Sequence, residues 1–456
     1  MLTLDVLLDA QLAGRLTYFQ EQNTFEFHYA PDWLSKQTSY SLSPKLSIEH
    51  SQTLPTPDQS AQIRFFFENL LPEGQALDDA AAASKVSKSN LVGLISALGR
   101  ETAGAVSLRF VGKGDPGDWQ DPYAGQPAEQ EKLRHLTREE LAQRINARPL
   151  EPFTVWDGKV RLSIAGFQDK IAVLKDEGEW YFIDAGARAS TVILKPEPLT
   201  RRLAGLTTNE FFCMRLAKAV GLPVADVRLV HLPNPVLEID RFDRVLEQGR
   251  IRRRHIIDGC QALGIAPGMK YERPYGDAKD VRDIRDGASL PRLFTFINDS
   301  TAPAAQRLHL LRWTIFQVLI GNTDAHAKNV SFYNDENGIR LTPTYDLVST
   351  LSFDGDALAD TLAMAIGDAF REPDITPYEW AHFAHRCGVR RPLLVQQLRD
   401  MSAKVTQHLG KIAAKVIEEG ADHAVVSRIC KTVEMISERH AAMAGRVAEV
   451  EKGLFE

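Results

Sequence analysis

The clearest indication of the fold is GNTDAHAKNVS, at Gly321–Ser331 of this sequence of 456 residues. Within it, Asp324 precedes Asn329 by five residues, which is the D-x-x-x-x-N spacing of a protein-kinase catalytic loop. In such a loop the Asp accepts the proton of the substrate hydroxyl, and the Asn holds magnesium. The spacing therefore predicts phosphoryl-transfer chemistry at this loop.

A third polar residue reaches the same loop through a predicted hairpin. Asp346 follows Asn329 by 17 residues, at the end of TPTYD. Between them, Val330–Tyr333 and Ile339–Thr342 read as two short strands around a turn rich in Asn, Asp and Gly. Because a hairpin returns the chain to where it left, we expect Asp346 and Asn329 to share one magnesium ion. An ordinary polar turn after a helix fits each of these residues singly, since Asn and Asp tolerate turn geometry.

Composition and charge narrow the class of protein. Hydrophobic residues make up 44% and charged residues 25% of the chain, as in ordinary globular enzymes, and the length predicts two or three domains. A net charge of −6 argues against a generic nucleic-acid binder. The N-terminus has no basic region of a secretory signal, and no apolar run spans a bilayer, so we expect no membrane association. Four widely spaced cysteines without a C-x-x-C pair predict reduced thiols in a cytoplasm.

The pattern of elements predicts an α+β fold of the bilobal protein-kinase-like kind. It has a β-rich N-terminal lobe with an added N-terminal subdomain, and a helical C-terminal lobe. The order strand, small-residue loop, strand, strand ending in Lys, helix, strand, strand is close to that of a kinase N-lobe. The predicted parts are a β-rich subdomain (1–111), a linker region (112–150), a nucleotide-binding lobe (151–242) and a helical catalytic lobe (243–456).

Individual elements follow from periodicity and from stop signals. A helix over Thr208–Val220 has Thr207 or Thr208 as its N-cap and Gly221 as its stop. The other predicted helices are Phe65–Gly74 including its stop, Ser89–Arg100 and Pro303–Ile320. The other predicted strands are Gly104–Phe110, Ile171–Leu174, Glu179–Ala185, Thr191–Lys195, Val227–Leu232 and Val236–Ile239.

Two segments of the predicted nucleotide-binding lobe are candidates for gripping phosphates. Lys195 ends a β-branched strand, as the phosphate-binding lysine of V-A-I-K does, although a lysine there also suits a solvated edge. Glu210 either pairs with Lys195 or stabilises the dipole of its own helix. SIAGFQDK, at Ser163–Lys170, does not match G-x-G-x-x-G, but its small residues allow close backbone approach and Lys170 neutralises phosphate oxygens. An ordinary surface turn fits the same segment.

Three further features have two interpretations each. Ser163, if phosphorylated, would add about −1.5 to −2 charges beside a nucleotide of like sign and push the loop away. The segment Asp240-Arg241-Phe242 lies where the strand-rich half meets the helical half, and is either an adenine-binding backbone or a plain turn. The basic residues Arg250, Arg252, Arg253 and Arg254 form either a solvated hairpin face or a contact with nucleic acid or an acidic partner.

Taken together, these segments resemble the HipA family of serine/threonine-protein kinase toxins. The resemblance runs from about residue 40 to 355, with every segment in the family's order. FFFENLLPEG (65–74) and GRETAGAVSL (99–108) are similar to the family's N-terminal subdomain. The other matching segments are SIAGFQDK (163–170), ILKP (193–196), RFDR (241–244), DGCQ (258–261), GNTDAHAKN (321–329) and PTYD (343–346).

The resemblance implies a protein kinase that uses ATP and Mg²⁺. Asp324 would be the proton acceptor, with Asn329 and Asp346 as metal ligands, and Ser163 matches the family's autophosphorylated serine. The residues implied to hold the nucleotide are Ala165, Gly166, Phe167, Gln168, Asp169, Lys170, Lys195, Asp240, Arg241, Phe242, His326, Lys328, Asn329, Tyr345 and Asp346. Two departures are that Asp169 replaces the Glu expected in QEK, and that no acidic residue immediately precedes Asp258.

The resemblance also implies partners. Such proteins act as the toxin of a toxin–antitoxin pair, bound to a small DNA-binding antitoxin that represses the operon, so operator DNA is met mainly through the antitoxin. Their protein substrates are translation components, notably aminoacyl-tRNA synthetases. Two other functions stay open from the residues: a nucleotide-binding corepressor whose catalysis is vestigial, and a metal-dependent hydrolase with Asp324, His326 and Asp346 as ligands.

Overall fold

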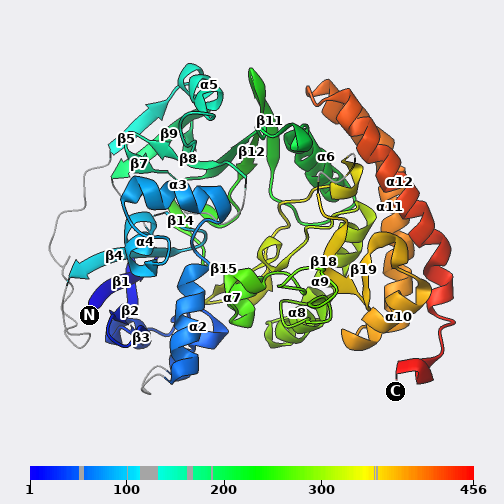
Figure 1. Ribbon diagram of the computed structural model, residues 1–456, viewed down its shortest axis with the longest axis horizontal. Coiled ribbons are helices and arrows are strands. Elements are labelled where there is room, and N and C mark those ends of the chain that lie inside the picture. The colour runs from blue at the N-terminus through cyan, green and yellow to red at the C-terminus, as the bar shows by residue number, and fades with distance from the viewer. Residues whose placement is uncertain are drawn as a thin grey trace. The chain divides into compact units, whose positions relative to one another are not determined.

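The computed structural model of the protein describes residues 1–50, 56–99, 101–112, 132–161, 168–185, 188–353, 355 and 358–455. The chain forms two compact units, each built from three separate segments. The first unit comprises Met1–Pro196, Glu238–Pro267 and Phe332–Gly338, and the second comprises Glu197–Leu237, Gly268–Ser331 and Ile339–Glu456. The first unit is rich in strands and the second is mainly helical (Figure 1), as expected for the predicted α+β class.

The first unit contains two main sheets, with short helices on them. Its helices are α1 (Pro31–Leu34), α2 (Pro57–Glu68), α3 (Gly74–Ser84), α4 (Leu91–Leu98), α5 (Arg138–Ala147) and α7 (Gly259–Leu263). Its strands are β1 (Leu2–Leu8), β2 (Gln11–Phe19), β3 (Thr24–Tyr29), β4 (Val106–Gly112), β5 (Lys132–Leu136), β6 (Val155–Trp156), β7 (Lys159–Val160), β8 (Ile171–Asp176), β9 (Glu179–Ala185), β10 (Val192–Pro196), β13 (Arg244–Glu247), β14 (Arg250–Arg253) and β15 (Ile256–Asp258).

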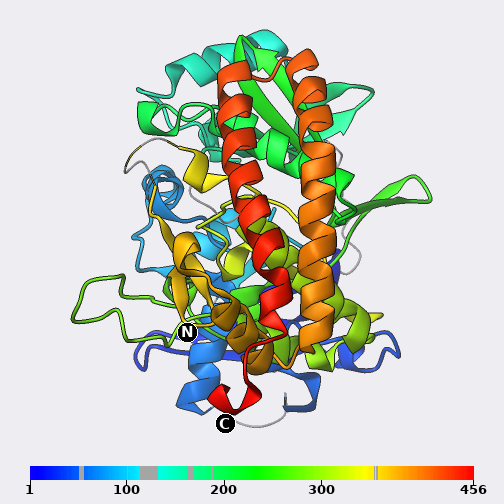
Figure 2. The ribbon, with the colours of Figure 1, turned by 90° about the vertical axis from the view of Figure 1, so that its right-hand side faces the viewer.

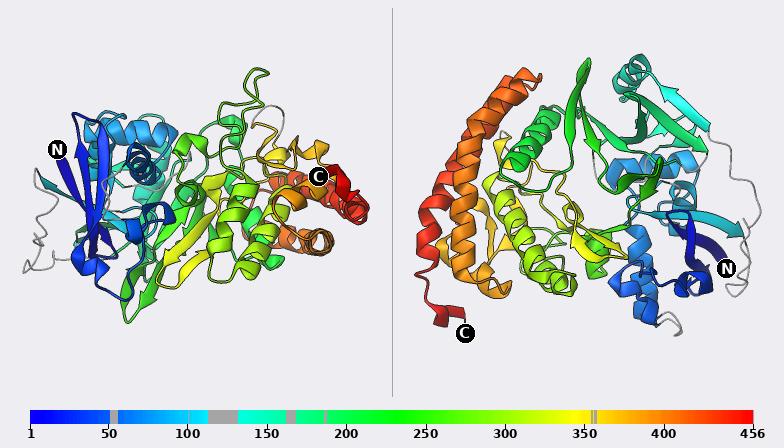
Figure 3. Two further views of the ribbon diagram at one scale, coloured as in Figure 1. Left: turned by 90° about the horizontal axis from the view of Figure 1, so that it is seen from below. Right: turned by 180° about the vertical axis from the view of Figure 1, so that it is seen from behind.

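The N-terminal sheet has the antiparallel order β3-β2-β1-β4. Figure 3 shows its dark blue strands beside the N-terminus. The helix predicted at Phe65–Gly74 is wrong at both ends, because α2 runs from Pro57 to Glu68 and Gly74 begins α3 instead of ending a helix. Helix α2 begins earlier because Thr56 and Gln59 form a capping box: Gln59 N–H donates to Thr56 Oγ1 at 3.3 Å and Thr56 N–H to Gln59 Oε1 at 2.8 Å. Its residues Phe66 and Phe67 are buried. The predicted strand at Gly104–Phe110 is found as β4, from Val106.

The second sheet of this unit places β10, β8, β9 and β5 next to one another in that order. The strands predicted at Ile171–Leu174 and Thr191–Lys195 are confirmed within a residue or two, and Glu179–Ala185 is found as predicted. Strand β5 and helix α5 fall inside the stretch 112–150 that the sequence suggested as a linker. The domain boundaries themselves stay a prediction.

The second unit is built around long helices. In Figure 2, α11 (Arg391–Glu418) and α12 (His423–Val447) run side by side as an antiparallel pair. None of the helices in the described part of the chain is long and apolar enough to cross a membrane. The remaining elements are α6 (Leu206–Ala219), β11 (Val227–Leu232), α8 (Leu290–Phe296), α9 (Pro303–Leu319), β18 (Thr361–Ile366), β19 (Ala369–Arg371) and α10 (Pro377–Arg386).

Three strands pass from one unit to the other along the chain. They are β12 (Asn234–Asp240), β16 (Ser331–Asp335) and β17 (Gly338–Leu341). The last two form the hairpin predicted from the Asn-, Asp- and Gly-rich turn, and β16 lies between β15 and β17 in a three-stranded sheet. Thr342 N–H donates to Ser331 O at 3.0 Å where the hairpin closes. The predicted return of the chain is therefore confirmed.

The start of α6 differs from the prediction. Its N-cap is Gly205, with φ of 88°, and neither Thr207 nor Thr208 caps the helix. The free N–H groups are met by Glu197, whose carboxylate accepts from Thr207 N at 3.2 Å and also from Gly205 N. A carboxylate at this end also favours the helix dipole. A cap supplied from eight residues upstream has no local signature, which explains the error.

Candidate active site

The predicted catalytic loop follows α9 in the second unit, and its entry is tightly constrained. Gly321 has φ of 65°, and a Cβ there would lie 3.0 Å from Ile436 Cδ1 and 3.1 Å from Leu351 Cβ, so both the backbone and the space require glycine. Thr323 N–H donates to Thr350 Oγ1 at 2.7 Å. The chain is therefore fixed just before Asp324.

Asp324, the predicted base, is exposed. Its own N–H donates to Asn322 Oδ1 at 3.0 Å, and its Oδ1 accepts from the Tyr271 hydroxyl at 2.7 Å. An exposed carboxylate on a fixed backbone suits a group that must meet an incoming hydroxyl.

The two predicted metal ligands lie together. Asn329 Nδ2 donates to Asp346 Oδ2 at 2.9 Å, so these side chains touch although 17 residues separate them. Tyr345 supports the pair, because its hydroxyl donates to Lys328 O at 2.7 Å and lies 2.6 Å from Ser331 Oγ. Asp346 has φ of 56°, a left-handed conformation that costs energy for a residue other than glycine.

The donor set suits a small, hard cation. An asparagine oxygen and a carboxylate are oxygen ligands of the kind that Mg²⁺ takes, with water and phosphate oxygens completing its shell. In the described part of the chain, no group of three His, Cys, Asp or Glu side chains could hold a metal ion. The oxygens of Asn329 and Asp346 fit magnesium by their chemistry, whereas Asp324, His326 and Asp346 are not grouped as ligands of one metal ion in the described residues.

His326 and Lys328 are both buried on the loop, each with 8% of its surface exposed. The ring of His326 lies edge-on to Tyr271, with centroids 5.2 Å apart at 85°. The second unit thus assembles Asp324, His326, Lys328, Asn329, Tyr345 and Asp346 on the loop and hairpin.

In the first unit, the two candidate phosphate lysines lie at the same end of adjacent strands. Leu194 of β10 pairs with Ile171 of β8 in antiparallel register. Lys195 follows the first and Lys170 precedes the second, and they are only 7% and 6% exposed. The strand register thus brings the two lysines to one end of the sheet, and their role in holding phosphate stays a prediction.

The described part of the predicted phosphate loop reaches the same strand end. Gln168 Nε2 donates to Pro196 O at 3.2 Å, directly after Lys195. Asp169 pairs with Arg148 at 3.5 Å, and burial raises the pKa of Asp169. Ser163, Ala165, Gly166 and Phe167 lie outside the described residues, so their predicted roles stay predictions.

The side chain of Arg241 serves the interior of the first unit. Its guanidinium donates to Glu101 Oε1 at 3.0 Å, to Ser190 Oγ at 2.8 Å and to both oxygens of Asp243. Its backbone N–H donates to Thr191 O at 2.9 Å. Its side chain and its amide N–H thus bond within the first unit, and its predicted contact with adenine stays a prediction.

For Asp240 and Phe242, which flank Arg241, the adenine-binding role also stays a prediction. Asp240 is the last residue of β12. The carbonyl of Phe242 accepts from the Tyr333 hydroxyl at 3.1 Å, and the two rings meet edge to face with centroids 6.3 Å apart.

The basic cluster does not form one solvated face. Arg250 and Arg252 are exposed on the β13–β14 hairpin, with 54% and 42% of their side chains accessible. Arg253 turns inward to Glu101 at 3.0 Å, and Arg254 lies 3.7 Å above the ring of Tyr333. Half of the cluster therefore stabilises the first unit.

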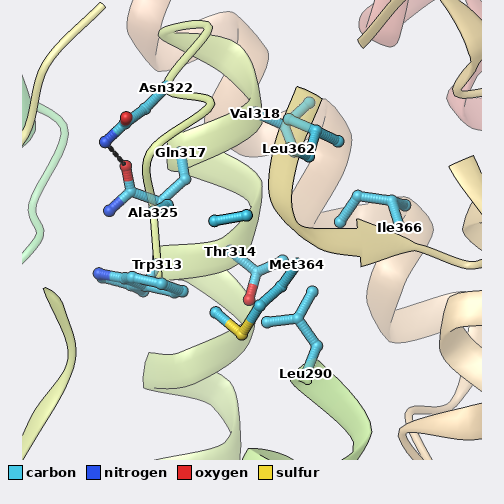
Figure 4. A pocket seen from close by; sticks show the side chains of 11 residues that line it. Leu290, Trp313, Thr314, Gln317, Val318, Asn322, Ala325, Leu362, Met364 and Ile366 are labelled. Carbon is cyan, nitrogen blue, oxygen red and sulfur yellow. Dashed lines mark hydrogen bonds between the residues drawn. The ribbon is translucent and has the colours of Figure 1, made fainter. Parts of the chain in front are cut away.

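A hollow beside the catalytic loop is lined mostly by apolar side chains from α8, α9 and β18 (Figure 4). Asn322 Nδ2 donates to Gln317 Oε1 at 2.8 Å. Among the residues that the structure describes, Trp313 Nε1 and Gln317 Nε2 are buried without a partner. The lining is Leu290, Trp313, Thr314, Gln317, Val318, Asn322, Ala325, Leu362, Ala363, Met364 and Ile366.

Two residues at this site were not predicted from the sequence. Tyr271 bonds to Asp324 from 53 residues away, and no motif spacing signals it. Asn209 of α6 accepts from Ser349 N at 2.8 Å and donates to Ser349 O and Ser352 Oγ, both at 3.0 Å. It ties α6 to the segment after Asp346, and only its place in a predicted amphipathic helix distinguished it.

Family models and known proteins match most of this chain. Models described as the HipA N-terminal domain and the HipA-like C-terminal domain match residues 4–109 and 162–409. The chain is 37% identical to the serine/threonine-protein kinase toxin HipA of Shewanella oneidensis, over 99% of this chain and 98% of that protein. It is 32% identical to the putative kinase Y4mE of Sinorhizobium fredii, over 92% and 93% of the two chains.

A solved structure gives the same result. HipA of Shewanella oneidensis, in a complex with HipB and its operator DNA, superimposes with a TM-score of 0.83 at 37% identity, over 98% of this chain and 100% of that chain. The fold is therefore kinase-like, and the chain is a protein serine/threonine kinase by its homology. It belongs to the HipA family of kinase toxins.

Proposed function

We propose that this protein is a serine/threonine kinase toxin that uses ATP and Mg²⁺. The observation that carries the proposal is the 2.9 Å hydrogen bond between Asn329 and Asp346, on a loop that also presents the exposed Asp324. Phosphoryl transfer needs little covalent chemistry from the protein, and depends on positioning and charge neutralisation. Asn329 and Asp346, as oxygen ligands of the metal, and Asp324, as the nearby carboxylate, would supply this positioning and charge neutralisation.

Each residue of the second unit has a distinct task in this proposal. Asn329 uses its amide N–H on Asp346, so its Oδ1 points elsewhere and would hold the metal together with the Asp346 carboxylate. Magnesium, when bound, neutralises charge on the phosphates. Asp324 would take the proton of a substrate hydroxyl at the oxygen that Tyr271 does not occupy. In the first unit, Lys170 and Lys195 would hold phosphate oxygens.

The test is transfer of labelled phosphate from ATP to protein. The purified chain, incubated with magnesium and cell lysate, should label at least one protein band. Asp324→Ala and Asp346→Ala should each lower the rate by about a thousandfold or more, the scale of a lost catalytic group. Asp360→Ala is the matched control, because that carboxylate is exposed and pairs only with surface Arg371 in the described residues. Labelling that survives both site variants would contradict the proposal, and so would tight ATP binding without transfer.

We also propose a translation component, such as an aminoacyl-tRNA synthetase, as the protein substrate, and hence a cytoplasmic location. The similarity to a serine/threonine-protein kinase toxin over 99% of this chain supports a protein substrate, and the choice of a translation component follows from the family resemblance. Mass spectrometry of the labelled band identifies the substrate, and a labelled protein outside translation would contradict this part.

A small DNA-binding antitoxin is the proposed partner, with operator DNA met mainly through it. The solved relative is a complex of HipA, HipB and operator DNA, which supports this choice. Co-purification of the chain with a small protein that carries it onto operator DNA is the expected result. Binding of the isolated chain to that DNA with equal strength would contradict it.

Autophosphorylation of Ser163 is proposed as the off-switch. A phosphate there would lie on the segment that leads to Lys170 and would repel a nucleotide of like sign. The phosphorylated chain should bind ATP more weakly than the Ser163→Ala variant incubated in the same way. Equal affinities would rule this switch out.

A further inference from the structure

A tyrosine far from the catalytic loop in sequence contacts the proposed base directly. The Tyr271 hydroxyl donates to Asp324 Oδ1 at 2.7 Å. Within the described part of the chain, no other side chain donates to this carboxylate. Oδ2 therefore remains available to a substrate hydroxyl, while Oδ1 is held.

The ring of Tyr271 is fixed against the loop it serves. It packs edge-on against His326, with centroids 5.2 Å apart. The preceding residue adds a backbone tie, because Ala327 N–H donates to Lys270 O at 3.1 Å. Two consecutive residues thus contact the segment just after Asp324.

The chain that carries Tyr271 is anchored by the next residue, Glu272, which is 1% exposed. Glu272 N–H donates to Ala363 O at 2.8 Å. Its carboxylate accepts from Ala365 N at 2.8 Å and from Arg285 Nε at 2.7 Å. A buried carboxylate with these partners fixes its neighbours, since leaving any of them unmet is costly.

Strand β18 connects the segment of Tyr271 to the catalytic loop. Ala363 N–H donates to Thr323 O at 2.8 Å, next to Asp324. Gly287 packs beneath the tyrosine's backbone, and a Cβ there would lie 1.8 Å from Tyr271 O. Ala363 of this strand therefore bonds to both Glu272 and Thr323, the sequence neighbours of Tyr271 and Asp324.

We propose that Tyr271 is a positioning residue that orients Asp324 for proton transfer. The proposal rests on the proposed role of Asp324 as the base. An exposed aspartate turns between rotamers, and a bond to one oxygen keeps the other directed at the substrate, so that proton transfer meets a preorganised acceptor. The opposite interpretation is that the hydroxyl occupies the substrate's place and must move away, but the backbone on either side of Tyr271 is anchored through Lys270 and Glu272.

The first test is Tyr271→Phe, which keeps the ring and removes only the hydroxyl. With magnesium and saturating labelled ATP, transfer to the labelled lysate band should fall about ten- to a hundredfold, the worth of a hydrogen bond to a charged group. The ATP concentration for half-maximal rate and the thermal midpoint should not change. Tyr275→Phe, at a tyrosine of the same segment that is 60% exposed, should change nothing. An unchanged or faster rate in Tyr271→Phe would overturn the proposal.

Substitutions at two glycines test whether the backbone position of Tyr271 matters, while its hydroxyl is kept. Gly287→Ala pushes on the backbone of Tyr271, whereas a Cβ at Gly268, in the same segment, meets nothing within 4 Å. The rate should fall in Gly287→Ala and stay unchanged in Gly268→Ala. Equal rates in the two variants count against the proposal.

Asp324→Asn, measured in parallel, separates this inference from the proposed function. If Asp324→Asn keeps full transfer, the proposed base is wrong. If it loses transfer while Tyr271→Phe keeps it, only the positioning role is wrong. Adding Tyr271→Phe to Asp324→Asn should cause no further loss, because the tyrosine acts through that carboxylate. A further tenfold loss would show that it acts elsewhere.

Discussion

At the scale of single residues, the candidate metal site carries backbone strain. Asp346 has φ of 56° and bonds to Asn329 at 2.9 Å. A non-glycine residue in the left-handed region costs about 1 kcal/mol. Strain of this kind persists where the surrounding structure enforces it, and here it places a carboxylate beside an asparagine.

Asp346→Gly should therefore separate stability from activity. Relief of the strain and loss of the hydrogen bond nearly offset each other, so the free energy of unfolding should change by less than about 1 kcal/mol. Phosphate transfer should fall to background because the metal ligand is gone. Chemical denaturation and the labelling assay measure the two effects. Glu177→Gly is the control, at an exposed turn with φ of 49°, and should leave transfer intact. A large loss of stability in Asp346→Gly would contradict the expectation.

Sequence spacing predicted the meeting of Asn329 and Asp346, and it did so for a local reason. The turn between β16 and β17 uses Asn, Asp and Gly, whose preferences act within a few residues. Tyr271 and Arg241 show the limit of such reasoning. Tyr271 contacts Asp324 across 53 residues, and Arg241 contacts Glu101 across 140. No local sequence pattern signals contacts between residues so far apart along the chain.

At the scale of elements, a buried charge cluster joins the segment after α4 to the segment after β12. The Glu101 carboxylate accepts from Arg241, Arg244 and Arg253, each at 3.0 Å. Burial alone would raise its pKa, but the three guanidinium groups outweigh burial and lower the pKa of Glu101 to about 2. The charged carboxylate therefore stabilises the first unit.

Glu101→Gln should destabilise the protein by about 3 kcal/mol at neutral pH, the usual cost of breaking a buried pair. Because the pKa is lowered on folding, this stabilisation is complete above pH about 4.5 and is lost as the pH falls toward about 2. The difference between the two proteins should therefore shrink in acid. Urea unfolding between pH 7 and pH 3 measures it. Glu68→Gln, which breaks a half-exposed pair with Arg64, should cost less than about 0.5 kcal/mol. A gap that grows in acid would contradict the mechanism.

The N-terminus of α6 makes a second prediction at this scale. Glu197→Ala removes the acceptor for the first N–H groups of the helix and should lower the free energy of unfolding by about 1–2 kcal/mol. The thermal midpoint should fall accordingly. Glu434→Ala, at an exposed position of α12, serves as control. An unchanged midpoint in Glu197→Ala would show that water satisfies this end.

Several helices and strands with strong local patterns were predicted well, but the helix expected at Phe65–Gly74 was not, since α2 ends at Glu68. Elements defined by distant partners were also predicted poorly. Helix α9 was expected at Pro303–Ile320 and is found at Pro303–Leu319. Strand β5 and helix α5 were missed because the Gly- and Pro-rich stretch before them suggested a linker. The start of α6 was placed wrongly because its cap comes from Glu197.

At the scale of the whole molecule, the chain crosses between its two units five times, since each unit is built from three segments. Phe332–Gly338 belongs to the first unit, while its neighbours in sequence belong to the second. Asn334 holds this segment in place, donating from Nδ2 to Ser41 O at 2.8 Å. Unfolding of the segment Phe332–Gly338 would therefore disturb the residues of the second unit on either side of it.

We therefore expect the two units to unfold as one. Hydrogen exchange in low denaturant should give the slowest amides of β8 in the first unit and of α9 in the second the same opening free energy, within about 1 kcal/mol. Mass spectrometry of peptic fragments resolves the two elements. Separate opening energies, with different dependence on denaturant, would show independent units.

The interleaving also sets an order of events during synthesis. Domains usually fold as they leave the ribosome, N-terminal first. Here the first unit lacks its last segment until Gly338 has emerged, and the second lacks α11 and α12 for longer still. Asp324, Asn329 and Asp346 are translated before their unit is complete, so a nascent kinase would stay inert until α11 and α12 have also been made.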